Sequence, residues 1–118
     1  GVFKAVAEAR GGVVIHCSAG RDRSGMIAAM LQGLAGAGED AIARGYERAA
    51  RGINEDHRVS AVPHPHERYV SGDVLAPLLE TRRDSLLRFV RHVRTGDFLR
   101  RNGVTDPEVS VILAKLGR

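Results

Sequence analysis

The chain has 118 residues, 43% of them hydrophobic, and a formal net charge of +4 at pH 7. This length suits one small globular domain, and no apolar run reaches the ~20 residues that a membrane-spanning helix needs. The three phenylalanines and two tyrosines do not interleave with basic residues, which argues against a nucleic-acid surface, and the single cysteine excludes an internal disulfide.

The first predicted helix covers residues 2–10, because their apolar residues recur with helical spacing. Gly11-Gly12 interrupts it. Residues 13–16 (Val-Val-Ile-His) then predict a short strand that is apolar on both faces, as in a buried parallel sheet. A single strand cannot make a sheet, so we expect its neighbours to come from outside this sequence.

A tight loop follows this strand and separates Cys17 from Arg23 by five residues. A loop of this kind before a helix N-terminus can surround a tetrahedral dianion with backbone N–H groups, and the helix dipole adds positive potential. Arg23 can bind two phosphate oxygens, while Cys17 at the base of the loop can attack phosphorus. The positive field lowers the pKa of the thiol, and Ser24 can donate a hydrogen bond to the thiolate. Gly20 and Gly25 permit close backbone approach and unusual dihedral angles.

The loop therefore defines the candidate site. Its predicted catalytic residues are Cys17, Arg23 and Ser24, to which the family resemblance given below adds Asp22. Its predicted phosphate-binding residues are Ser18, Ala19, Gly20, Arg21, Asp22 and Arg23. This chemistry needs no metal and no cofactor, so we expect neither.

Residues 16–25 (His-Cys-Ser-Ala-Gly-Arg-Asp-Arg-Ser-Gly) resemble the phosphate loop of cysteine-dependent tyrosine phosphatases. This motif is similar to that of the bacterial branch that includes the secreted mycobacterial tyrosine and phosphoinositide phosphatase. That branch commonly has Lys-Asp-Arg-Thr where this chain has Arg-Asp-Arg-Ser over residues 21–24. Gly45-Tyr46 and residues 97–106 also resemble later parts of this branch.

The resemblance implies an α/β fold in which the phosphate loop follows a central strand. Residues 1–118 would then be a single partial domain, the mostly helical C-terminal half, and the sheet would be completed by an N-terminal half or by self-association. The resemblance also makes Asp22 a candidate general acid, although orienting Arg23 or the loop is an equally open role. We expect His16 to position the cysteine loop rather than to act as a base.

After the loop, the apolar spacing predicts helices over residues 24–35, 39–51, 82–94 and 97–102. The first of these is apolar nearly all round, which predicts that it is buried. Thr105-Asp106-Pro107-Glu108 has the form of a capping box before a last helix. Residues 53–77 contain three histidines and three prolines and predict an irregular loop or a lid over the site, with a short helical turn near its end.

These features together predict a protein-tyrosine phosphatase that hydrolyses phosphate monoesters through a cysteinyl-phosphate at Cys17. The resemblance implies that the substrate is phosphotyrosine in a protein; a phosphoinositide or dual-specificity phosphatase and a non-catalytic phosphate-binding fragment are the alternatives. We expect no nucleic-acid partner and no stable membrane insertion. A lone cysteine is typical of a reducing compartment, so we expect a cytoplasmic location, with export without a recognisable signal as the alternative.

Overall fold

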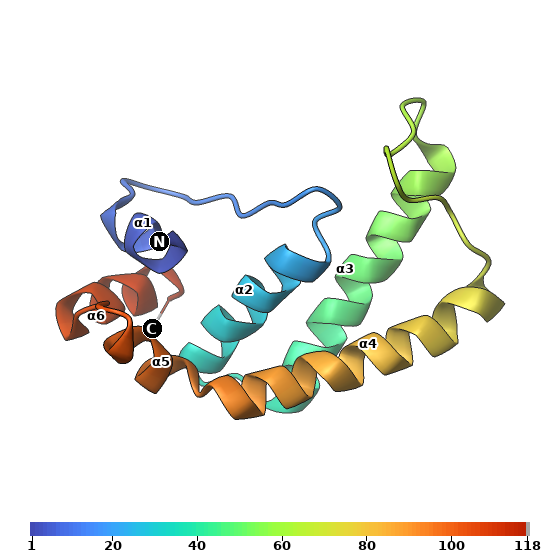
Figure 1. The fold of residues 1–118 in the computed structure, drawn as a ribbon. Coiled ribbons are helices and arrows are strands. Elements are labelled where there is room, and N and C mark those ends of the chain that lie inside the picture. Colours follow the sequence, from blue (N-terminus) through green and yellow to red (C-terminus); the bar gives the residue numbers. More distant parts are fainter. Residues whose placement is uncertain (118) are drawn as a thin grey trace.

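Six α-helices make up the regular structure of the computed structural model, which describes residues 1–117. They are α1 (Val2–Glu8), α2 (Asp22–Leu34), α3 (Glu39–Val59), α4 (Gly72–Val93), α5 (Thr95–Arg101) and α6 (Asp106–Lys115). The central helix is α2, which contacts α3, α4 and α5, while α1 packs against α6 (Figure 1). In this part of the chain, every helix is too short or too polar to cross a membrane.

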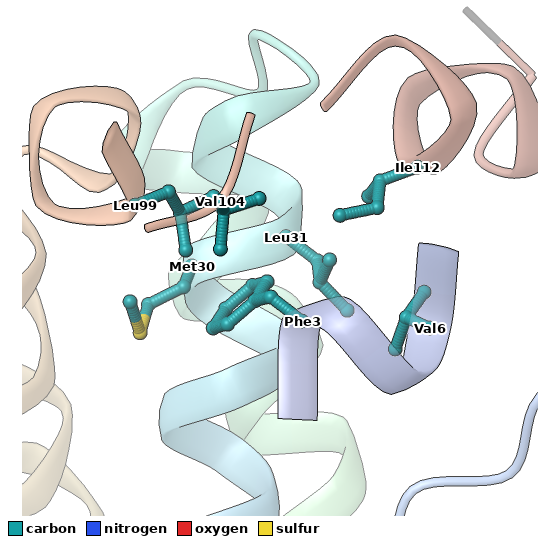
Figure 2. Close-up of a cluster of buried hydrophobic side chains, with 7 residues drawn as sticks. All are labelled: Phe3, Val6, Met30, Leu31, Leu99, Val104 and Ile112. Atoms are coloured by element: carbon teal, nitrogen blue, oxygen red, sulfur yellow. The ribbon is translucent and has the colours of Figure 1, made fainter. Parts of the chain in front are cut away.

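The helix after the candidate phosphate loop, α2, contributes to two hydrophobic clusters through Ala29, Met30 and Leu31, which are buried, whereas Met26 is 40% exposed; the predicted burial is confirmed only for this part of the helix. The first cluster lies between α1, α2 and the C-terminal helices (Figure 2) and contains Phe3, Val6, Met30, Leu31, Leu99, Val104 and Ile112. The second joins α2 to α3 and α4 and contains Ala29, Ile42, Tyr46, Ala50, Leu75, Leu79 and Leu86. Each large side chain buried in this way stabilises the fold by about 1.5–3 kcal/mol.

The predicted α/β fold with a central strand is wrong, because residues 1–117 contain no strand. The segment before Cys17 crosses from α1 to α2 as an extended trace (Figure 1). Its β-branched residues favour an extended backbone, yet Val13 is 42% and Val14 is 87% exposed. A strand also needs hydrogen bonds to a neighbouring strand, and residues 12–16 make no backbone hydrogen bond within the described chain.

The stretch over residues 53–77 is more helical than predicted, because α3 extends into it and α4 begins within it. Pro77 lies inside α4, where a proline costs about 3 kcal/mol in a helix interior. Leu75 and Leu79 are buried on either side of it, and each contributes about 1.5–3 kcal/mol, which offsets that cost. Only residues 60–71 remain irregular, and we call this connection between α3 and α4 the strap.

The capping box at the start of α6 is confirmed. The Thr105 hydroxyl accepts a hydrogen bond from the backbone N–H of Glu108, and the Glu108 carboxylate accepts one from the backbone N–H of Thr105. Lys4 of α1 donates to the same carboxylate at 2.8 Å, which ties the two ends of the described chain together. Hydrogen bonds from Lys4 and then from Thr105 lower the pKa of Glu108 to about 2.

Candidate functional site

The phosphate loop, residues 17–23, turns directly into the first turn of α2. Gly20 has a φ of +76°, a left-handed conformation that strains any residue with a Cβ atom, so the turn depends on glycine here. At Gly25, a Cβ would lie 3.6 Å from the ring of Tyr46 in α3, which is an ordinary van der Waals contact. Of the two glycines, Gly20 is therefore the one that the backbone of the turn requires.

The Cys17 thiol lies at the base of this loop and is partly buried. The hydroxyl of Ser24 is buried and has no nitrogen or oxygen partner in the described chain, and it is the largest cause of the lowered pKa of the Cys17 thiol. Hydrogen bonds from the Ser24 hydroxyl and backbone N–H, together with the N–H groups of Gly20 and Arg23, outweigh desolvation and lower the pKa of Cys17 from 9.0 to about 6. About nine-tenths of the thiol is therefore ionised at pH 7.

Arg23 follows on the first turn of α2 and is exposed. Its guanidinium makes no hydrogen bond or ion pair with another side chain in residues 1–117, so it can receive an incoming anion. A cleft of about 550 Å³ opens beside the loop. Its lining includes Ser18 and Ala19 of the loop, Ile53 of α3 and His64 of the strap, but neither Cys17 nor Arg23.

Arg21 has a different environment from Arg23, because its side chain is only 12% exposed. Its guanidinium donates from Nη1 to Glu67 Oε2 at 3.0 Å and from Nη2 to Glu67 Oε1 at 2.6 Å. It also donates from Nε to Asp22 Oδ1 at 3.1 Å. Burial by itself would lower the pKa of Arg21, but the bonds to Glu67 and Asp22 prevail and raise it. The side chain of Arg21 is thus fully engaged within the protein.

Glu67 is held from a second side by His57 of α3. The Nε2 atom of His57 lies 3.0 Å from Glu67 Oε2, and the His57 side chain is 11% exposed. Hydrogen bonds from Arg21 and from His57 lower the pKa of Glu67 to about 2. The carboxylate is therefore ionised and can only accept, so Nε2 of His57 carries the proton and donates.

The strap has a further contact with the phosphate loop through His64. Its Nδ1 accepts hydrogen bonds from the backbone N–H groups of His66 and Glu67, so this nitrogen is unprotonated. Its Nε2 must then carry the proton, and it donates to Ser18 Oγ at 3.1 Å. No group of three or more potential metal ligands gathers anywhere in residues 1–117.

The remaining predicted site residues lie at the edge of this arrangement. Asp22 is exposed and accepts hydrogen bonds from Arg21 through both of its oxygens. His16 is exposed, and its side chain makes no hydrogen bond in the described chain; its positioning role stays a prediction. The loop thus brings Cys17 together with Ser24, whereas Arg21 turns away toward the strap.

Sequence reasoning missed Glu67 as a neighbour of the loop. It lies 46 residues after Arg21, among histidines and prolines that predict only an irregular loop. The one available signal was the presence of a single acidic residue in residues 60–71, and that pattern does not say which arginine it meets. His57 was missed for a related reason, because it was assigned to the loop rather than to α3.

The loop thus combines a helix N-terminus, a thiol of lowered pKa and an exposed arginine, the features that anion binding and nucleophilic attack require. The chain belongs to the tyrosine phosphatase family, whose model matches residues 1–116. No curated protein and no solved structure matches the chain significantly.

Proposed function

We propose that the chain is a protein-tyrosine phosphatase that hydrolyses phosphate monoesters with Cys17 as its nucleophile. One observation supports this above all: N–H groups of Gly20, Arg23 and Ser24 converge on the Cys17 sulfur and, with the Ser24 hydroxyl, lower its pKa to about 6. The same N–H groups would bind phosphate oxygens. Membership of the tyrosine phosphatase family agrees with this chemistry.

The reaction has two steps. The Cys17 thiolate attacks phosphorus, an S–P bond forms, and the P–O bond to the leaving group breaks as an acid protonates that oxygen. Water then attacks phosphorus and gives a proton to the conjugate base; the S–P bond breaks, which releases inorganic phosphate and restores the thiolate. Arg23 and the loop N–H groups stabilise the charge on the non-bridging oxygens.

Asp22 is the candidate for the acid within this chain, because it is exposed on the loop beside Arg23. Its competing role is to orient the loop through Arg21, to which both of its oxygens are bonded. If Asp22 is the acid, Asp22→Asn lowers kcat about 10²–10⁴-fold and removes the limb of the pH–rate profile that reports it. If it orients the loop, the profile keeps its shape. Asp40→Asn, an exposed acid on α3, is the matched control.

We further propose that residues from outside this sequence cover Val13 and Val14. Their exposure and the unpaired backbone of residues 12–16 support this. Exposed apolar side chains of this kind gain from burial against a partner surface. The substrate is a phosphotyrosine-containing protein in this proposal.

Hydrolysis of an aryl phosphate by the chain and by Cys17→Ser, with orthovanadate as inhibitor, tests the proposed activity. We expect turnover that orthovanadate inhibits and that falls to the background rate in Cys17→Ser. The same assay on a longer chain that carries the N-terminal part of the domain tests whether that part is needed. Phosphate binding without turnover in both chains would contradict the enzyme and favour a non-catalytic phosphate-binding protein.

A further inference from the structure

We propose that Glu67 is a positioning residue of the phosphate loop: its paired contact with Arg21, backed by His57, holds the loop with its N–H groups facing the Cys17 sulfur. The proposal rests on the proposed function in one respect, that Cys17 is the reactive group of the site. It assigns to the strap a role in preparing the nucleophile.

The first argument is the geometry of the contact. Both oxygens of Glu67 bind the guanidinium of Arg21, at 2.6 and 3.0 Å, in the parallel arrangement that fixes orientation as well as distance. The side chains are 12% exposed at Arg21 and 24% exposed at Glu67, so water competes little for these bonds. Such a pair constrains the backbone position of Arg21.

The second argument is where Arg21 lies in the loop. It is the N-cap residue of α2 and stands between Gly20 and Arg23, two residues whose N–H groups face the sulfur. Its neighbour Gly20 is in the left-handed region, a conformation that the surrounding structure must hold in place. A side chain fixed at this point therefore limits the movement of the N–H groups on both sides.

The third argument is that Glu67 is itself held firmly. His57 of α3 donates to Glu67 Oε2 at 3.0 Å. On either side of Glu67 the strap is anchored, by His64 to Ser18 and by Val70 to Asn54. The position of Glu67 is therefore determined by α3 and the strap, and it can transmit that position to the loop.

A purely electrostatic role for Glu67 predicts the opposite result from a positioning role. Removal of a negative charge near the site would favour the thiolate and lower the pKa of Cys17. Loss of positioning would instead turn N–H groups away from the sulfur and raise that pKa. The direction of the shift therefore distinguishes the two roles.

The experiment is the pH dependence of Cys17 alkylation by iodoacetamide, which reports one thiol because the chain has one cysteine. We expect the wild-type midpoint near pH 6. In Glu67→Gln and in Glu67→Asp, we expect the midpoint to rise by about one unit, so that alkylation at pH 6 slows about fivefold. Glu67→Asp keeps the charge but shortens the side chain, and it is the milder variant for folding.

The control is Glu55→Gln, which removes an acid from the exposed pair with Arg58 on the same helix as His57. Its midpoint should equal that of the wild type, and circular dichroism should show all variants folded. An unchanged or lowered midpoint in either folded Glu67 variant would overturn the proposal. Alkylation needs no turnover, so this test remains decisive even if the chain shows no phosphatase activity.

Discussion

Two irregular segments meet at the phosphate loop, and they are held in different ways. The strap, residues 60–71, is anchored at three points by side-chain hydrogen bonds, through His64, Glu67 and Val70. In the extended segment before Cys17, Lys115 donates to the carbonyl oxygens of Ala9 and Gly11, and Ile15 packs against the first hydrophobic cluster. The two valines of this segment are exposed, and the backbone of residues 12–16 is unpaired.

The difference shows which contacts of the site lie within this chain. On the strap side, polar groups that would be costly to bury are satisfied by partners from α3 and from the loop. On the other side, apolar groups that would gain from burial have no cover. The loop is thus supported on one side by its own chain, and we expect its other side to gain support from outside residues 1–118.

The largest expected effect in this comparison comes from releasing the end of the strap. Asn54 of α3 donates to the Val70 carbonyl and accepts from the Val70 N–H, each at 3.0 Å. Asn54→Ala removes both bonds, and we expect a loss of about 1–3 kcal/mol in the free energy of unfolding, measured in urea. Asn102→Ala, which removes one exposed bond to Phe98, is the control and should cost less. Equal losses in the two variants would mean that Asn54 does not anchor the strap.

Lowering the pH is expected to have a smaller effect on the free energy of unfolding. The pKa of Glu67 in the folded chain is about 2, below its ordinary value of 4.5, so its ionised form favours folding. That contribution is complete above pH 4.5 and is lost as pH falls toward 2. We expect Glu67→Gln to lose less stability than the wild type between pH 5 and pH 3, in urea unfolding at each pH.

Glu108 titrates in the same range, because its pKa is also lowered to about 2. Glu108→Gln therefore measures the part of the acid-induced loss of stability that does not come from the strap. If Glu67→Gln were as sensitive to acid as the wild type, the ion pair with Arg21 would not stabilise the folded chain.

The smallest effect on the free energy of unfolding is expected from a substitution in the extended segment before Cys17. Val14 is 87% exposed, so Val14→Ser should change the free energy of unfolding by no more than about 0.5 kcal/mol. Val6→Ser, at a position only 7% exposed, should cost several times more. A large loss at Val14, together with a dimeric mass in sedimentation, would instead indicate that a second copy covers the segment. In the longer chain with the N-terminal part of the domain, Val14→Ser should become destabilising.

The family and some local structure could be predicted from local sequence. The candidate phosphate loop was predicted from the spacing of Cys17 and Arg23 and from the residues around them; the family that it resembles is confirmed, and the roles of its residues stay predictions. The burial of Ala29, Met30 and Leu31 in α2 was predicted from the apolar composition of the helix, and the capping box at Thr105 was predicted from its four-residue pattern. These features depend on neighbours within a few residues, so short patterns are sufficient to identify them.

The sheet and the strap could not be predicted in this way. Residues 13–16 have the composition of a strand, but hydrogen bonds to a neighbour make a strand, and composition does not provide one. The prolines and histidines of residues 53–77 suggested a loop, whereas the burial of Leu75 and Leu79 extends a helix through Pro77. Tertiary packing outweighed local preference there.

The two loop arginines mark the boundary between what sequence and structure decide. The sequence by itself determined that Arg21 and Arg23 flank an acid, and it predicted that the three lie in a phosphate loop at a helix N-terminus. Only the tertiary structure decided that Arg23 stays exposed while Arg21 is bound by Glu67, 46 residues away. The physical reason is that a buried charge must be paired, and the packing of α3 and the strap against the loop determines which partner is within reach.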